Sequence, residues 1–396
     1  MAGLVVSPRA RIYHGHDWVY SSEIKKTFGD PAPGEVVTLK DFKDRPLGSA
    51  IYNPASQIVA RRISRRTQDL DADFFERRLA RAHAFRHDTL GLPDDAPQRL
   101  VWSESDGLPG VVIDRYGTHF VLQTLTLGMD LRKGLIADAL ASRFGAASVI
   151  ERNDSPIRKA EGLELVTGVL RGTDPGAIEV TTPAGIRLGS IPLEGQKTGL
   201  YLDQFASYAE VAAHAPGRRV LDMFSNQGGF ALHCAAAGAA TVTAVESSAP
   251  AVAGIRENAE RNGLADKIEA VEHNAFDFLK HAAADSDSPQ YDLIVLDPPS
   301  FTKSKKRLND ALRGYKEIHL RALQLLAPGG LLATFCCSHH VTDHDFRGVI
   351  MSASVDAKRT LRERARFRQR PDHPIIPTIP ETEYLKGYLL EVVPSW

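Results

Sequence analysis

The sequence predicts an α/β protein whose C-terminal half is a doubly wound, largely parallel β-sheet, with a small β-barrel and a central α+β domain before it. The first observation is the strict alternation of apolar strand-like runs and helix-like segments from about residue 205 onward. The second is the clustering of short β-rich runs and turn residues in the first 70 residues. The third is the length of 396 residues, which exceeds that of one typical domain.

The N-terminal 70 residues read as short strands. Val36–Leu39 and Ala50–Tyr52 are β-rich, and Gly34, Gly48 and Asn53-Pro54 separate them as turns. This pattern predicts a small β-barrel over residues 1–70.

Residues 71–190 are predicted to form the central α+β domain. Apolar residues at helical spacing predict a helix over 73–87. Strands are expected near 98–103, 110–115 and 118–127, followed by a helix near 130–143 and a strand near 147–151.

The third predicted domain covers residues 191–396. Its strands are expected at 220–224, 241–246, 267–271, 291–296 and 330–336, with helices between them. We expect a last strand at 388–393 to close the sheet.

The composition narrows the class of protein. Basic and acidic residues nearly balance, 48 against 49, which argues against a polycation but leaves local patches open. The N-terminal residues lack a signal-peptide pattern, and no apolar run is long enough to cross a membrane. Three cysteines, two of them adjacent, form no disulfide framework. We therefore expect a cytoplasmic protein with no membrane contact and no metal site.

Polar residues and glycines stand where the predicted parallel strands end, which is where ligands bind in such sheets. The first strand leads through Asp222 and Phe224 into Gly228-Gly229, where glycine permits a tight turn close to a ligand. Glu246 ends the second strand, where a carboxylate can accept hydrogen bonds from both ribose hydroxyls. Asn274 follows the third strand and is predicted to meet an adenine edge.

The fourth strand ends in Asp297-Pro298-Pro299. The glycine loop differs from G-x-G-x-x-G, so a dinucleotide is not the obvious ligand. Taken in order, these strand ends resemble those of class I methyltransferases with a Rossmann-like sheet. That resemblance implies S-adenosyl-L-methionine as the cofactor.

Two further features at the sheet edge suggest the chemistry. Pro298 and Pro299 form a rigid turn, and Phe301 is predicted either to stack on a base or to pack in the core. The fifth strand ends in Cys336-Cys337. Because neighbouring side chains on a strand point to opposite faces, we expect Cys337 to face the substrate and Cys336 the core. A thiolate there can add to C6 of cytosine and activate C5, with Asp297 holding the base.

At this point the chain resembles a named family, the RlmI-type 23S rRNA cytosine-5 methyltransferases, over nearly its whole length. The segments that carry the resemblance are Gly15–Val19, Tyr52–Ser56, Glu104–Gly110, Asp114–Tyr116, Glu151–Asn153, Gln196–Gly199, Tyr201–Gln204, Asp297–Phe301, Cys337–His339, Pro371–Pro374 and Pro380–Lys386. The resemblance implies an N-terminal PUA-like RNA-binding domain, a central domain and a catalytic domain. It implies that Gln196, Lys197 and Thr198 line the cleft.

The resemblance also implies a mechanism with one cysteine, Cys337, because Ser300 stands where two-cysteine enzymes carry another thiol. The chain departs from the family pattern at three places, one of which is Phe335-Cys336 in place of a more polar pair. Phe205 stands where the family usually has arginine, and Asn274 where aspartate is commoner.

Clustered basic residues are candidates for RNA contacts. Arg61 and Arg62 end the predicted barrel, and Lys303 and Lys305 follow the Asp-Pro-Pro turn. The alternative for each residue is a solvated charged surface.

The leading interpretation is an rRNA methyltransferase that forms 5-methylcytosine in 23S rRNA or the large ribosomal subunit. One alternative is a guanine or adenine N-methyltransferase, which needs no cysteine. Another is a non-catalytic RNA-binding protein that retains the cofactor fold. The oligomeric state stays open, a homodimer included.

Overall fold

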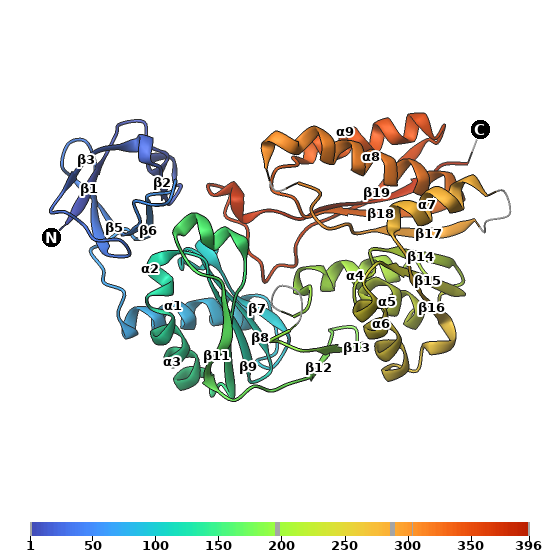
Figure 1. The fold of residues 1–396 in the computed structure, drawn as a ribbon, viewed down its shortest axis with the longest axis horizontal. Coiled ribbons are helices and arrows are strands. Elements are labelled where there is room, and N and C mark those ends of the chain that lie inside the picture. The colour runs from blue at the N-terminus through green and yellow to red at the C-terminus, as the bar shows by residue number, and fades with distance from the viewer. Residues whose placement is uncertain (1, 195–198, 286–289, 303, 395–396) are drawn as a thin grey trace. The chain divides into compact units, whose positions relative to one another are not determined.

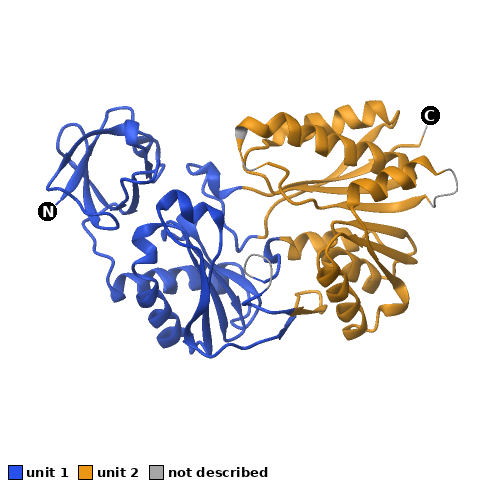
Figure 2. Cartoon of the chain, viewed as in Figure 1, with its two compact units in different colours: residues 1–180, 190–203, 371–383 blue, residues 181–189, 204–370, 384–396 orange. Residues whose placement is uncertain are grey.

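The computed structural model describes residues 2–194, 199–285, 290–302 and 304–394. The chain divides into two compact units, shown in Figure 2. Unit 1 consists of Met1–Val180, Ser190–Asp203 and Pro371–Glu383, and unit 2 of Thr181–Gly189, Gln204–Arg370 and Tyr384–Trp396.

The N-terminal part of unit 1 is the predicted strand-rich domain. Its strands are β1 (Gly3–Val6), β2 (Trp18–Val19), β3 (Ile24–Phe28), β4 (Val36–Lys40), β5 (Pro46–Tyr52) and β6 (Ala60–Ser64). They form a six-stranded sheet in the order β2-β6-β5-β4-β1-β3 (Figure 1). Leu4, Val6, Val37 and Leu39 alternate with outward residues along β1 and β4, and they fill the interior.

The central part of unit 1 is a five-stranded sheet with helices packed on it. The strands, in the order β11-β10-β9-β8-β7, are β7 (Gln98–Trp102), β8 (Val111–Tyr116), β9 (His119–Thr124), β10 (Ser148–Asn153) and β11 (Val166–Gly172). The helices are α1 (Ala72–Ala84), α2 (Leu127–Asp130) and α3 (Lys133–Phe144). Asp71 begins α1 because its carboxylate accepts a hydrogen bond from the Phe74 amide.

A segment from late in the sequence belongs to unit 1. In Pro371–Glu383, the Asp372 carbonyl accepts a bond of 2.7 Å from Arg86 Nη2, and the Thr382 carbonyl accepts one of 3.1 Å from Trp102 Nε1. The sequence alone placed these residues in the C-terminal domain.

Unit 2 contains a seven-stranded sheet in the order β16-β15-β14-β17-β18-β20-β19. Its strands are β14 (Arg219–Met223), β15 (Thr241–Glu246), β16 (Ile268–Glu272), β17 (Tyr291–Leu296), β18 (Leu326–Cys336), β19 (Leu361–Phe367) and β20 (Lys386–Val392). The first five run parallel, as predicted, while β20 is antiparallel to both β18 and β19. The expectation that the last strand closes the sheet is wrong, because β20 lies inside it and β19 forms the edge.

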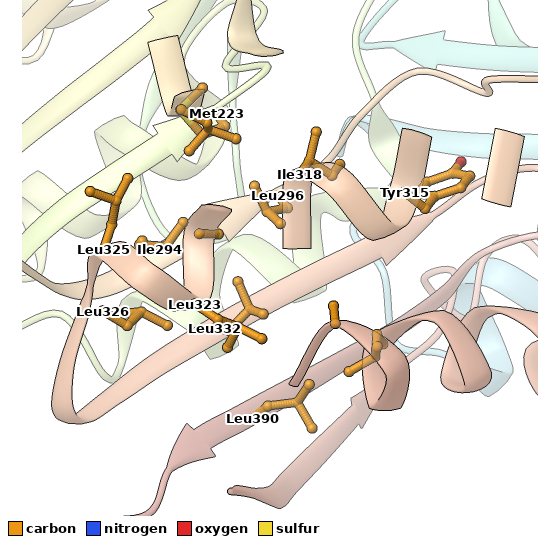
Figure 3. Packing of buried hydrophobic residues seen from close by; sticks show 14 of the residues in the cluster. Met223, Ile294, Leu296, Tyr315, Ile318, Leu323, Leu325, Leu326, Leu332 and Leu390 are labelled. Carbon is orange, nitrogen blue, oxygen red and sulfur yellow. The ribbon is translucent and has the colours of Figure 1, made fainter. Parts of the chain in front are cut away.

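Helices cover both faces of this sheet (Figure 1). They are α4 (Phe205–Ala212), α5 (Gly229–Ala236), α6 (Ala249–Arg261), α7 (Ala275–Ala284), α8 (Leu308–Leu325) and α9 (Asp343–Asp356). The short strands β12 (Ile178–Thr181) and β13 (Arg187–Ser190) pair separately. Figure 3 shows Ile294, Leu296 and Leu332 from the central strands packed with Ile318 and Leu323 of α8. This core holds the carboxyl ends of β14, β17 and β18 in fixed positions.

Candidate active site

The loop after β14 has an unusual backbone. Phe224 and Asn226 have positive φ angles of 61° and 50°, and Gly228 follows at 85°. A left-handed conformation is costly for a residue with a Cβ, and such strain concentrates at ligand-binding sites. The loop leads directly into α5, whose first amides point back toward it.

Asp222 anchors this loop. Its Oδ2 accepts hydrogen bonds from Ser225 Oγ at 2.6 Å and from the Ala231 amide at 3.0 Å. Its buried Oδ1 has no hydrogen-bond partner among the described residues. Burial raises the pKa of Asp222 to about 7, although the bonds from Ser225 and Ala231 oppose the shift. A buried carboxylate with an unused oxygen is suited to a cationic ligand.

This pKa predicts a pH-dependent stability. Since the folded pKa of Asp222 lies above its ordinary value of 3.8, the folded state binds the proton more tightly, and stability falls as pH rises toward about 7. Asp222→Asn removes this effect. We expect the free energy of unfolding of Asp222→Asn, relative to that of the wild type, to increase by roughly 2–3 kcal/mol between about pH 5 and 8. Calorimetric melting of both proteins across this range tests it, and a constant difference in Tm would contradict the shifted pKa.

Glu246, at the end of β15, is half-buried and faces the same loop. Its Oε2 accepts a hydrogen bond of 3.0 Å from the Asn226 amide, and its Oε1 accepts bonds from the amides of Ser247 and Ser248. These bonds fix the carboxylate, and its remaining lone pairs can accept hydrogen bonds from vicinal hydroxyl groups.

Asn274 is the N-cap of α7. Its Oδ1 accepts hydrogen bonds from the amides of Phe276, at 2.9 Å, and Asp277. The side chain is therefore held beside the ends of β15 and β16, and its amide group retains its donors for a ligand.

Gly229 starts α5 in close contact with an aromatic ring. A Cβ placed on Gly229 would lie 2.4 Å from Cζ of Tyr208, a side chain of α4 that is itself buried. The glycine lets the first turn of α5 approach this ring, so its role here is close packing.

We expect Gly229→Ala to lower the melting temperature and weaken cofactor binding, since overpacking costs about 1–3 kcal/mol. Gly254→Ala is the matched control. The nearest atom to a Cβ on Gly254, in α6, is Gln227 Cγ at 3.8 Å, so alanine fits there and favours the helix. Calorimetry and a cofactor titration compare the two variants, and equal behaviour would rule out the close packing as the cause.

Asp297 ends β17 and is held by Gln204, whose Nε2 donates a hydrogen bond of 2.9 Å to Asp297 Oδ2. Gln204 Oε1 is buried and has no partner among the described residues. Of the prolines that follow, Pro298 is buried and Pro299 exposed. A carboxylate and an amide oxygen thus lie together at the centre of the strand ends.

Phe301 packs in an aromatic cluster. Its ring centre lies 4.5 Å from that of Tyr315 and 5.5 Å from that of Phe276. The sequence left stacking on a base and core packing open, and the structure shows packing on one side of a half-buried ring.

The two adjacent cysteines differ as predicted in exposure. Cys336 is fully buried, and its Sγ lies 3.4 Å from the hydroxyl of Tyr315, whereas Cys337 is partly exposed at the end of β18. Burial raises the pKa of Cys336, which disfavours its thiolate.

Lys386 anchors the segment that follows Cys337. Its Nζ donates hydrogen bonds of 2.8 Å to the carbonyl oxygens of Ser338 and Val341. Neither Lys386 nor Gln204 was identified from sequence as a site residue. The register of the antiparallel pair β18–β20, which places Lys386 opposite Cys336, could not be read from the chain.

Two predicted RNA contacts have internal partners. Arg61 forms an ion pair of 3.0 Å with Glu161 and lies over the ring of Trp18, and Arg62 pairs with Asp17 at 2.6 Å. Their side chains are only 12% and 7% exposed, so their charges serve the fold of unit 1. Gln196, Lys197, Thr198 and Lys303 lie outside the described residues, as does the side chain of Lys305.

Two kinds of feature, a metal-binding cluster and a membrane-spanning helix, are absent from the described residues. Among them, no cluster of three or more His, Cys, Asp or Glu side chains is arranged to hold a metal ion. No helix within the described part of the chain has the length and hydropathy needed to cross a membrane.

The strained loop after β14, the carboxylate of Glu246 at the end of β15 and the strand order are those of a class I, Rossmann-like methyltransferase domain that uses S-adenosylmethionine. Residues 176–380 match the S-adenosylmethionine-dependent methyltransferase family, and residues 8–65 match a PUA-like domain. The chain belongs to the family of ribosomal RNA large subunit methyltransferase I, as its similarity to curated relatives shows.

The relative from Klebsiella pneumoniae (strain 342) is 39% identical over 96% of this chain and 94% of its own length. The one from Vibrio parahaemolyticus is 39% identical over 98% of each chain. Both are named ribosomal RNA large subunit methyltransferase I.

Solved structures share the fold. A methyltransferase complexed with SAH superposes with a TM-score of 0.85 at 22% identity, over 99% of this chain and 100% of the other. A SAM-dependent methyltransferase from Streptococcus mutans gives 0.84 at the same identity and coverage.

Proposed function

We propose that this enzyme forms 5-methylcytosine in the 23S rRNA of the large ribosomal subunit, with Cys337 as the nucleophile. The observation that carries the chemistry is the partly exposed residue Cys337 directly after β18, the strand next to β17, which is followed directly by Asp297. The names of the curated relatives and the PUA-like domain support an rRNA substrate.

The cofactor site is proposed from the residues around the strained loop. Glu246 accepts the ribose hydroxyls, Asn274 meets the adenine edge, and Phe224, Gly228 and Gly229 form the wall against which the cofactor lies. Asp222 contributes its Oδ1, which has no hydrogen-bond partner among the described residues, to the proposed cofactor site. The family resemblance also implies Gln196, Lys197 and Thr198 as cofactor residues, and these three lie outside the described residues.

The proposed reaction is covalent catalysis. The thiolate of Cys337 adds to C6 of the cytosine, and the electron pair of the C5–C6 double bond moves to C5. S-adenosylmethionine, when bound, would supply the electrophilic methyl group that C5 takes up, with the S–CH3 bond breaking and S-adenosylhomocysteine as the leaving group. When a base removes the C5 proton, the double bond forms again and expels the thiolate. Asp297 accepts a hydrogen bond from the exocyclic amino group, with Gln204 keeping its carboxylate in place.

The residues proposed to surround the cytosine base come from the turn that follows β17. Pro298 and Pro299 keep the chain beside Asp297 rigid, and the half-buried ring of Phe301 closes one side of the base pocket. Lys303 and Lys305 follow this turn and contact the RNA backbone in the proposal.

We also propose three domains, with boundaries near residues 70 and 190, and a cytoplasmic location, where ribosomes are assembled. The PUA-like match to residues 8–65 and the methyltransferase match to residues 176–380 support this division.

Methyl transfer from labelled S-adenosylmethionine to unmodified 23S rRNA, followed by nucleoside mass spectrometry, tests the function. We expect 5-methylcytidine at one position. Methylguanosine or methyladenosine would favour the N-methyltransferase, and cofactor binding without transfer to any RNA would favour the non-catalytic alternative.

A further inference from the structure

The N-terminal sheet of unit 1 carries lysines on its outer face. In the register of β3, β1 and β4, Lys26 and Lys40 both lie opposite Val5. Directly opposed residues point to the same face, and Leu4 and Leu39, which neighbour Val5 and Lys40 in the chain, point to the interior. Lys26 on β3 and Lys40 on β4 therefore project outward from one surface, and β3 forms an edge of the sheet.

An aromatic ring lies on this same face. Phe28 is opposite Gly3, and a Cβ on Gly3 would lie 2.4 Å from Cζ of Phe28. The ring of Phe28 thus lies across the backbone of β1, with the Lys40 ammonium 5.2 Å from its centre. Gly3 allows this flat arrangement, since any side chain would displace the ring.

The turn after β4 continues the pattern of rings and cations. Phe42 is 37% exposed, and the Lys43 ammonium lies 5.7 Å from its ring centre. The hydroxyl of Tyr13, a residue that is 36% exposed, bonds to the backbone of Phe42. The surface is defined by Lys26, Phe28, Lys40, Phe42 and Lys43, and we refer to it as the lysine–phenylalanine face.

Two acidic residues near this face are already engaged. Asp41 is buried and paired with Arg45 at 2.6 Å, and it also accepts bonds from the amides of Lys43 and Arg45. Asp44 pairs with Lys40 at 3.0 Å. Within the described part of the chain, no ion pair is recorded for Lys26 or Lys43, so both cations face solvent without a carboxylate.

We propose that the lysine–phenylalanine face binds an unpaired stretch of RNA, with Lys26 and Lys43 on phosphates and a base stacked on Phe42. Cations beside exposed rings suit a single-stranded polyanion whose bases offer flat faces. The inference rests on the proposed function, in which RNA is the substrate, and it names the surface that holds that RNA. Arg61 and Arg62, the contacts expected from sequence, have internal partners instead.

Protection of the sheet edge would explain only some of the residues of the lysine–phenylalanine face. Lysines on an edge strand prevent one sheet from pairing with another, and Lys26 on β3 satisfies that need. Edge protection does not explain an exposed phenylalanine next to Lys43, since an exposed ring costs free energy in water.

The experiment uses the full chain and a fluorescein-labelled, unstructured RNA of about 12 nucleotides. Fluorescence anisotropy gives Kd between about 50 and 200 mM salt. We expect Lys26→Ala and Lys43→Ala each to lower the slope of log Kd against log salt by about 0.7, which is the value for one phosphate contact on a single strand. Phe42→Leu keeps an apolar side chain but loses the ring, and it should weaken binding about 5- to 100-fold without changing the slope.

Lys280→Ala, at an exposed position on α7, is the matched control and should bind like the wild type. If all three surface variants also bind like the wild type, the proposal is overturned. Methylation of 23S rRNA by the wild-type protein tests the proposed function separately. In that assay the surface variants should raise KM for RNA and leave kcat unchanged.

Discussion

Cys337→Ala should lower the rate of methyl transfer by about 10³-fold or more, which corresponds to roughly 4 kcal/mol of transition-state stabilisation. The reason is that C5 of cytosine is a poor nucleophile until a thiolate adds at C6, and Cys337 is the partly exposed thiol at the strand end. Cofactor affinity should stay the same, because no proposed cofactor contact involves this side chain. Single-turnover transfer to 23S rRNA and a cofactor titration measure the two quantities.

Cys336→Ala is the control. Cys336 is fully buried against Tyr315, and its raised pKa keeps the thiol protonated near neutral pH. We expect near wild-type activity and a loss of about 1 kcal/mol in stability. The covalent mechanism fails if Cys337→Ala retains more than a tenth of the activity, or if Cys336→Ala is the inactive variant. RNA containing 5-fluorocytidine should trap a covalent complex with Cys336→Ala and none with Cys337→Ala.

The difference in exposure between the two cysteines was predictable because it depends on local geometry. Side chains alternate along a strand, so a buried Cys336 at the strand end favours a more exposed residue after it. The parallel strands were predictable for a similar reason, since strands covered on both faces are continuous apolar runs such as Tyr291–Leu296.

Features that depend on distant partners could not be predicted. Arg61 and Arg62 look like a basic cluster in the sequence, but Glu161, which neutralises Arg61, lies 100 residues away in the chain. Asn274 was expected at a ligand, and the fold also uses it to begin α7. The edge strand β19 was missed because Arg362, Glu363, Arg364 and Arg366 make Leu361–Phe367 look like a solvated segment.

The late segment Pro371–Glu383 is a further case. It follows β19 in the chain and precedes β20, yet its hydrogen bonds place it in unit 1, including one of 2.7 Å from Ser105 Oγ to the Pro374 carbonyl. Three residues after this segment the chain enters β20 at Lys386. Lys386, the first residue of β20, therefore follows this segment closely in the chain. Its Nζ also donates a hydrogen bond to the carbonyl of Ser338, the residue after Cys337.

Lys386→Met should lower kcat by about 10- to 100-fold while the Kd of the cofactor stays within about twofold. Methionine has a similar length but cannot donate, so the carbonyls of Ser338 and Val341 lose the 2.8 Å bonds that hold the chain after Cys337. Hydrogen bonds from a charged group contribute about 1.5–3 kcal/mol each, and an error of about 1 Å in the position of a reacting atom costs about 100-fold in rate. Steady-state kinetics with 23S rRNA and a cofactor titration give both values.

Lys316→Met is the matched control, since Lys316 is a partly exposed lysine of the same unit that pairs with Asp356 at 2.7 Å. Its loss should leave kcat unchanged. Lys386→Arg keeps the charge and the donors and should recover part of the activity. The rate at which iodoacetamide alkylates Cys337 separates positioning from general instability, because a displaced thiol changes that rate while Cys336 stays protected. If Lys386→Met alters cofactor affinity and melting temperature but not the alkylation of Cys337, then Lys386 stabilises unit 2 and does not position the nucleophile.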